Sequence, residues 1–462
     1  MRYLKWVFLF ATLLLAFLAG AVIATYKHLG RTPGELMDHA EQRLQGHPKL
    51  ELIALPVLAY FREKLDAPSE PQRKQQKFNV PPLAPQLGSH SANRHSQNVD
   101  QLSARVLRVS PGSAIPSIRV AAQLAKDGDI VEISAGEYHA DVAVWKQKAL
   151  TIRGVGGRAR LYADGASAEG KAIWVFRNGE FVIENVDFIG ARVADRNGAG
   201  IRFVEGRMTV RNCLFYNNET GLLTADKKDA ELIIENSEFA YNGSGDGRSH
   251  NLYVGDIRLL KIRGSYFHHA NVGHLIKSRA SENIIEYNRL TDEPGGLSSY
   301  ELELPNGGYG LIIGNIIQQN RNSENSTIVS YGAEGYKTPS NTLFLINNTI
   351  VNEHPDGGAF LRVAQGNTRV ISHNNLLVGA GQNHVPGTLD SKNDIFADWD
   401  IFEMPQRQNY TLSKIGQNLP TINKTLSHDT PLPTHEYVHP LSTRMLTSTR
   451  LYPGASQPTR SQ

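Results

Sequence analysis

Cysteine is almost absent from this chain of 462 residues, and charges of the two signs nearly cancel. The single cysteine, Cys213, excludes a disulfide within the chain, and we expect a small buried thiol there. The formal net charge is only +3, which is too small to indicate a nucleic-acid partner. Leucine-rich, ankyrin and tetratricopeptide patterns are also missing, which excludes those repeat folds.

One long apolar run is present, and it lies at the N-terminus. Arg2 and Lys5 precede an uncharged stretch over residues 6–25, which is long enough to cross a hydrocarbon core of ~30 Å as a helix. We interpret residues 1–30 as a transmembrane anchor, or as a signal segment cleaved near Ala19-Gly-Ala21. The preceding positive charge predicts that the rest of the chain lies outside the cytoplasm, in the cell envelope on its periplasmic or extracytoplasmic side, or is secreted.

Composition divides the remainder into four segments. Residues 31–66 have helical apolar spacing, which predicts short juxtamembrane helices. Residues 67–104 are rich in Pro, Gln, Ser, His and Lys, and this composition is typical of a flexible, disordered linker. We expect the folded domain over 105–400, and a closing coil with an irregular tail over 401–462.

A short pattern returns nine times between about residue 150 and residue 380. Each copy has alternating apolar residues followed by Asn or Gly. Those anchor residues are Gly154, Asn185, Asn212, Asn236, Gly264, Asn288, Asn315, Asn347 and Asn374. The steps between successive anchors run from 24 to 32 residues. A nearly constant period with variable insertions predicts a stacked solenoid, in which each unit buries its apolar face against its neighbours.

The local period identifies the kind of solenoid. Apolar residues alternate within each copy and Ile, Val and Phe dominate, so the copies are strands. We therefore predict an all-β fold, a parallel β-helix. Asn suits the bend between strands because it tolerates left-handed backbone torsions, and its amide can bond to the equivalent amide one coil above. The alternative is a β-sandwich with Asn-rich loops.

The start of the domain carries a resemblance to a known group. Residues 117–125 read as an amphipathic helix, followed by the turn Lys126-Asp-Gly-Asp129, a strand over 130–133 and Gly136-Glu-Tyr138. This succession resembles the start of right-handed parallel β-helix proteins of the pectate-lyase-like group, whose capping helix closes the first coil. The resemblance covers about residues 105–400. It implies a fold and not a reaction, because this fold hosts lyases, hydrolases, epimerases and inert binding shafts.

Residues 250–335 are richer in polar and aromatic groups than the other coils. If Leu252, Ile276, Leu302 and Leu304 point inward, strand alternation sends their neighbours outward. Those neighbours are Asn251, Tyr253, Lys277, Arg279, Glu301 and Glu303. Since successive coils lie about 4.8 Å apart, these side chains are expected to form one external patch.

The patch has the groups needed to cleave an acidic polysaccharide by β-elimination at a uronate. A Lys with a lowered pKa can act as base, so Lys277 is the candidate base, and Arg279 would hold the sugar carboxylate. The candidate proton donors are Tyr300, His274 and His250. The predicted substrate-binding residues are Asn251, Tyr253, Glu301, Glu303, Asn306 and Tyr331. Glu301 and Glu303 could also bind Ca²⁺ through their oxygens.

The segment around Lys277 carries a second resemblance. Ile276-Lys277-Ser278, followed by Asn283 and Asn288, is similar to the pattern of alginate and chondroitinase-B-type lyases of polysaccharide lyase family six. There a Lys acts as base, an Arg on the next coil acts as acid, and Ca²⁺ assists, which implies a base at Lys277. The place of the Arg falls at Pro305 here, so either Arg279 substitutes for it, or the activity differs, or none survives.

Two interpretations without catalysis by the patch remain open. Its basic and acidic residues can form a ladder of surface ion pairs, each worth about 0–1 kcal/mol. His268, His269 and His274 can form a zinc site, although turn-exposed His residues are the more frequent case.

Two further functions compete with the lyase. Glycoside hydrolysis needs two carboxyl groups, and Glu301 and Glu303 on one strand face would lie ~7 Å apart. Alternatively, a membrane-tethered β-helix binds a secreted polysaccharide during export and stacks sugar rings on its tyrosines, which are Tyr253, Tyr300, Tyr309, Tyr331 and Tyr336. A lyase needs an unpaired cation in an open groove, whereas a binding shaft tolerates fully paired charges.

Overall fold

The computed structural model describes residues 104–424 and 430–458. The expected membrane anchor, the juxtamembrane helices and all but the last residue of the linker lie outside these residues. Within the described ranges, no helix has the length and apolar character needed to cross a membrane.

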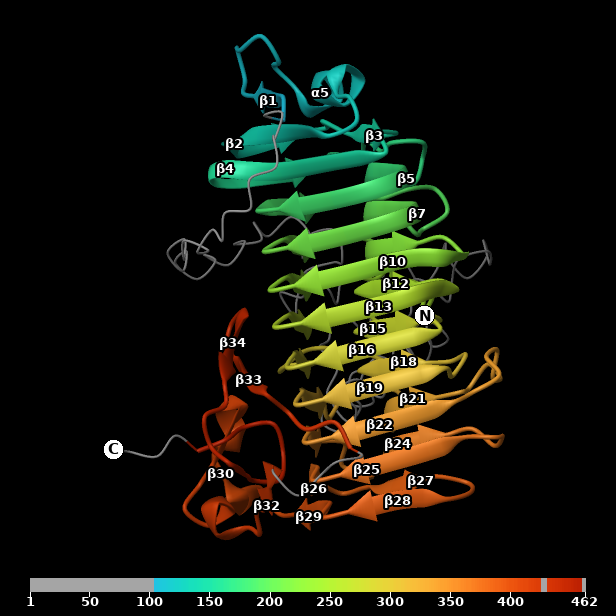
Figure 1. The fold of residues 1–462 in the computed structure, drawn as a ribbon, viewed down its shortest axis with the longest axis vertical. Coiled ribbons are helices and arrows are strands. Elements are labelled where there is room, and N and C mark those ends of the chain that lie inside the picture. Colours follow the sequence, from blue (N-terminus) through green and yellow to red (C-terminus); the bar gives the residue numbers. More distant parts are fainter. Residues whose placement is uncertain (1–103, 425–429, 459–462) are drawn as a thin grey trace, which may run out of the picture. The chain divides into compact units, whose positions relative to one another are not determined.

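The described chain winds into a β-helix whose coils each contribute up to three parallel strands, so three sheets run along the solenoid (Figure 1). Sheet I comprises β1 (Val106–Val109), β2 (Asp129–His139), β4 (Ala149–Tyr162), β5 (Ala172–Glu184), β7 (Ala199–Arg211), β10 (Lys227–Glu235), β13 (Ile257–Arg263), β16 (Glu282–Glu286), β19 (Tyr309–Ile313), β22 (Thr342–Ile346), β25 (Arg369–His373) and β28 (Leu389–Lys392).

Sheet II follows the bend at the end of each sheet I strand. It comprises the last parts of β2 and β4, then β6 (Val186–Ile189), β8 (Leu214–Tyr216), β11 (Glu238–Ala240), β14 (Tyr266–His268), β17 (Arg289–Thr291), β20 (Ile316–Gln319), β23 (Thr349–Asn352), β26 (Leu376–Gly379) and β29 (Ile395–Ala397).

Sheet III closes each coil before the chain returns to sheet I. It comprises β3 (Ala143–Trp145), the first parts of β5 and β7, then β9 (Thr220–Thr224), β12 (Leu252–Val254), β15 (Ile276–Ser278), β18 (Leu302–Leu304), β21 (Thr327–Tyr331), β24 (Ala359–Val363) and β27 (Gln382–His384). The predicted parallel solenoid of strands is confirmed.

The predicted capping helix is α5 (Ile118–Leu124), at the end of the solenoid where the chain enters it. Ser117 caps it, because its side chain accepts a hydrogen bond from the amide of Val120. The helix buries Ile118 and Ala121 against the first coil, so the open end of the core is covered.

Stacked aromatic rings fill the interior of the middle coils. Phe188, Phe215, Phe239 and Phe267 lie in consecutive coils with ring centroids 5.0, 4.4 and 4.6 Å apart, and all four are fully buried. Parallel in-register pairing places equivalent side chains above one another, so a repeated Phe becomes a continuous stack. Cys213 is buried as expected.

The recurring Asn residues play the two parts that the sequence predicts. Asn185, Asn212 and Asn347 take positive φ values of 59°, 48° and 51° at the bend between sheets I and II. A buried ladder of amides runs through the position after the bend, where Asn288 Nδ2 donates to Asn315 Oδ1 at 3.0 Å and Asn315 Nδ2 donates to Asn348 Oδ1 at 3.1 Å. The ladder satisfies polar groups that the core would otherwise leave unpaired.

The C-terminal segment folds back over the outer face of sheet II and does not form an irregular tail. Its elements are η1 (Trp399–Ile401), β30 (Phe402–Met404), η2 (Pro405–Arg407), β31 (Asn409–Leu412), η3 (Gly416–Asn418), β32 (Ile422–Asn423), β33 (His435–Val438), β34 (Ser442–Met445) and β35 (Arg450–Leu451). Phe402, Tyr410 and Tyr437 pack with the outward side chains of Val351 and Leu376 in one buried cluster. The segment therefore covers an apolar strip of sheet II and leaves sheet III uncovered by this cluster.

Candidate functional site

One row of outward side chains follows the outer face of sheet III. Parallel register aligns Tyr253 with Lys277, Lys277 with Glu303, Glu303 with Ser330, Ser330 with Arg362 and Arg362 with His384. We call these six residues the sheet III row. The row residue is the middle residue of β12, β15 and β18, the fourth residue of β21 and β24, and the last residue of β27, so the row presents one side chain per coil.

Lys277 lies at the centre of a closed set of ion pairs. Its Nζ is 2.9 Å from Glu303 Oε2 and 3.0 Å from Glu334 Oε1, and its side chain is 14% exposed. Burial of the ammonium group lowers its pKa, but the two carboxylates outweigh burial, so the pKa of Lys277 lies above its ordinary value. The residue is therefore held as an ammonium ion, whereas a lysine base needs the opposite shift.

Arg279 is paired as completely as Lys277. Its Nε and Nη2 donate to the two oxygens of Glu334 at 2.8 and 2.7 Å, and its Nη1 donates to the Tyr253 hydroxyl at 2.6 Å. The guanidinium carbon lies 5.1 Å from the centroid of the Tyr253 ring. Lys277 and Arg279 thus both already have carboxylate partners.

Glu334 is the residue that the sequence interpretation missed. It lies in the loop after β21, and it binds Lys277 and Arg279 from an earlier coil. Burial raises its pKa, but the two basic residues outweigh burial, so the pKa of Glu334 lies below its ordinary value. The only signal in the sequence is the polar stretch Tyr331-Gly-Ala-Glu334-Gly335 within the candidate region.

Three ring side chains line the edge of the row in successive coils. The His274 ring stacks on Tyr300 with centroids 4.9 Å apart, and its other neighbour is His250 at 4.3 Å. Burial, followed by the charges of Lys277 and Arg279, lowers the pKa of His274 to about 3. His274 is therefore neutral at physiological pH. Among the described residues, its Nδ1 has no hydrogen-bond partner.

The structure corrects the predicted positions of Glu301 and Asn251. Glu301 is fully buried, and its carboxyl accepts hydrogen bonds from Ser298 at 3.0 Å and Gln319 at 3.3 Å. Asn251 is also inside, where its Oδ1 accepts from Asn242 Nδ2 at 2.8 Å. Both residues directly precede a sheet III strand, where the chain bends, so strand alternation does not extend to them.

Tyr331 and Asn306 are not on the outer surface either. Tyr331 is fully buried and donates its hydroxyl hydrogen bond to the carbonyl of Gly308. Asn306 is 8% exposed. Of the predicted site residues, the structure brings together Tyr253, Lys277, Arg279 and Glu303, with His250, His274 and Tyr300 beside them.

The residues predicted to bind Ca²⁺ or zinc do not come together in the structure. Glu301 lies inside and Glu303 is paired with Lys277, so the two carboxylates do not face one cation. Burial raises the pKa of Glu301 well above its ordinary value, which favours its neutral form. His268 approaches Glu238 on sheet II, while His274 faces sheet III. Within the described parts of the chain, no cluster of three or more His, Cys, Asp or Glu residues can hold a metal ion.

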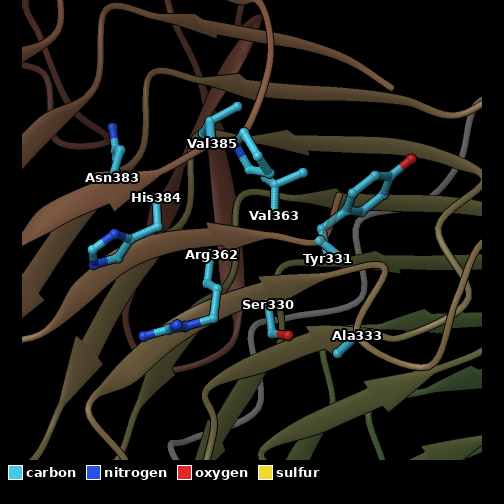
Figure 2. Close-up of a pocket in the computed structure, with 10 residues that line it drawn as sticks. Ser330, Tyr331, Ala333, Arg362, Val363, Asn383, His384 and Val385 are labelled. Atoms are coloured by element: carbon cyan, nitrogen blue, oxygen red, sulfur yellow. The ribbon is translucent and has the colours of Figure 1, made fainter. Parts of the chain in front are cut away.

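A pocket of about 640 Å³ continues the row toward the C-terminal end (Figure 2). Ser330, Arg362 and His384 line it from three successive strands, and the figure shows the Arg362 side chain between the other two strands. The remaining lining residues are Tyr331, Ala333, Val363, Ala364, Asn383, Val385 and Pro386. The polar cluster around Lys277 and this pocket therefore share one face.

A comparison with protein families supports the observed fold. A family described as right handed beta helix region matches residues 164–300, which include Tyr253 and Lys277. With the three parallel sheets, this confirms the predicted right-handed parallel β-helix.

Two solved structures are similar at low sequence identity. A crystal structure of pectate lyase Pel9A is 14% identical, covers 72% of this chain and 96% of its own, and has a TM-score of 0.44. Geobacillus virus E2 ORF18 is 13% identical, covers 58% of this chain and 53% of its own, and has a TM-score of 0.32. Neither similarity identifies a reaction, so the function has to be argued from the site.

Proposed function

We propose that this protein binds polysaccharide along the outer face of sheet III as a non-catalytic β-helical shaft, outside the cytoplasm as the apolar run over residues 6–25 predicts. One observation carries the proposal, namely the pairing of every charge in the cluster around Lys277. A network of this kind holds its donors and acceptors in fixed positions, where sugar hydroxyls can bond to them without a change in charge.

The shape of the face supports an extended ligand. The sheet III row presents a side chain about every 4.8 Å along the solenoid, and the pocket lengthens the same strip. Tyr253 and Tyr300 add partly exposed rings beside the charged groups, and such rings supply apolar area for sugar faces. A strip with these features suits a chain of linked sugars better than a compact small molecule, which prefers an enclosed and mainly apolar cavity.

Elimination with Lys277 as base has less support. The reaction needs a neutral amine that removes the proton next to the sugar carboxylate. The carboxylates of Glu303 and Glu334 raise the pKa of Lys277 and keep it charged. Both cations of the cluster are also engaged by carboxylates, so neither is free to neutralise a substrate.

Glycoside hydrolysis is a second candidate, with a different carboxylate pair from the one expected. Glu303 Oε2 and Glu334 Oε1 lie 2.9 and 3.0 Å from the same Nζ, so these two oxygens are less than 6 Å apart. Retaining glycosidases place two carboxyl groups at about 5–5.5 Å. The predicted pair of Glu301 with Glu303 is excluded by the burial of Glu301.

The test separates the three functions. Full-length protein is incubated with alginate, pectate, glucuronan and a neutral glucan, with and without Ca²⁺, and binding is measured by calorimetry. Absorbance of unsaturated uronate ends and formation of new reducing ends are recorded in parallel. We expect binding without either product. New reducing ends without this absorbance would show that the protein is a hydrolase, and the absorbance would show that it is a lyase. Either result, or the absence of binding to every polymer, would refute the proposal.

A further inference from the structure

Arg362 differs in its ion pairs from Lys277 of the sheet III row and from Arg279, which lies beside Lys277. Lys277 and Arg279 are each bound to carboxylates, whereas Arg362 makes no ion pair with any residue in the described ranges. Its Nε donates to Thr327 Oγ1 at 3.1 Å, which orients the side chain, and the two terminal nitrogens make no hydrogen bond to another described residue. The residue is exposed.

In the described part of the chain, the lining of the pocket around Arg362 also lacks acidic residues. Among the described residues, the pocket of about 640 Å³ around it has no Asp or Glu in its lining. Its polar groups are Arg362, Ser330, His384 and Asn383. Figure 2 shows the side chains of Arg362, Ser330 and His384 pointing away from those of Val363 and Val385. An anion in the pocket would therefore meet a cation, hydrogen-bonding groups and no repelling carboxylate from the lining.

We propose that this pocket is a subsite for an anionic substituent, a carboxylate or a sulfate, on a polysaccharide that lies along the sheet III row. The inference rests on the proposed function and specifies its ligand as an acidic glycan. The guanidinium presents two parallel N–H groups, which match a carboxylate or a sulfate in a two-pronged pair. Ser330 and His384, one coil to either side, supply hydrogen bonds to neighbouring hydroxyls.

The register gives the subsite its position relative to the Lys277 cluster. Lys277 and Arg362 are separated by the coils that carry Glu303 and Ser330, so they lie three coil spacings apart, or about 14 Å. An extended chain of several sugar units can therefore contact both places. The charges of the cluster around Lys277 cancel, so this cluster would bind sugar hydroxyls. Arg362 would select for a sugar that carries a negative charge.

The experiment compares Arg362→Gln with Arg369→Gln in the full-length protein. Arg369, on β25 of sheet I, is also exposed and makes no ion pair within the described ranges, so it is a matched control for the loss of one charge. The probes are hexasaccharides of galacturonate, glucuronate and mannuronate, the carboxyl-reduced form of each, and a sulfated neutral hexasaccharide. Affinities are measured by calorimetry at low and high salt.

We expect Arg362→Gln to weaken binding of at least one acidic hexasaccharide by about tenfold, which corresponds to one charge-assisted pair, and Arg369→Gln to leave it unchanged. The reduced forms should bind both variants as they bind the parent, and the responsive probe distinguishes carboxylate from sulfate. If glycans bind and Arg362→Gln has no effect on any acidic probe, the subsite is wrong while the shaft stands. If no probe or polymer binds the parent protein, both proposals fail.

Discussion

Lys277 Nζ and Glu303 Oε2 lie 2.9 Å apart across adjacent coils, and both side chains are largely buried. The two residues are direct register partners on β15 and β18, so the solenoid itself brings them together. A pair in this position is held by the backbone ladder and needs little side-chain ordering. A substitution at this pair therefore changes both the candidate site and the stability of the two coils that the pair joins.

Substituting Lys277 by Met should destabilise the fold. The change removes the cation that faces Glu303 and leaves a buried carboxylate uncompensated, which costs about 3 kcal/mol in the free energy of unfolding. Urea denaturation at pH 7 measures the loss. The double variant Lys277→Met with Glu303→Gln also removes the uncompensated negative charge. It should therefore recover more than half of the lost free energy of unfolding. Equal stability of the parent and the single variant would contradict the ion pair.

The buried His274 should make stability fall in acid. Its pKa is lowered to about 3 in the fold, so the unfolded chain binds the extra proton between that value and about 6.5, and stability is lost as the pH falls through this window. Between pH 7 and pH 5 one such His contributes about 2 kcal/mol of the loss. His274→Phe keeps a ring against Tyr300 and should reduce the pH dependence by about that amount. Denaturation curves at the two pH values check this, and an unchanged difference would contradict the neutral buried state.

Breaking the amide ladder at Asn315 should weaken the middle coils. Asn315 Oδ1 accepts from the amide of Asn288, and its Nδ2 donates to the carbonyl of Ile285 at 2.8 Å. Asn315→Ala leaves several buried polar groups without partners, so we expect a loss of about 3 kcal/mol by chemical denaturation. The exposed Asn367 serves as the control, since Asn367→Ala should change stability by no more than about 0.5 kcal/mol.

The Tyr253 ring should contribute to glycan binding more than its hydroxyl does. Tyr253→Ala removes the ring beside the paired charges and is expected to weaken binding of the best polymer by about tenfold. Tyr253→Phe loses only the hydrogen bond from Arg279 and should retain most of the affinity. Tyr309→Ala, at a ring on sheet I that is 36% exposed, is the control and should have no effect. Calorimetry on the folded variants measures these affinities. An equal loss of affinity in Tyr253→Ala and Tyr309→Ala would show that sheet III is not the binding face.

The parts of the fold that depend on neighbouring residues were predictable. Alternation of Ile, Val and Phe identified the strands, and the Asn residues marked the bends and the ladder, because backbone torsion and side-chain direction depend on a few adjacent residues. The same reasoning placed Lys277 and Glu303 on one face correctly, since both occupy the middle of a strand. It failed for Glu301 and Asn251, which sit at bends where alternation ends.

The sequence by itself determined a stack of parallel strands with Asn at its corners, because a repeated local pattern can bury its apolar face only against copies of itself. Only the tertiary structure decided which groups meet. Glu334 reaches Lys277 and Arg279 from more than 50 residues away, because the loop after β21 turns back over the face. Arg362 lines a pocket and makes no ion pair with another described residue, which the strand pattern also did not predict. Contacts between coils depend on the lengths and conformations of the insertions, which a strand pattern does not encode.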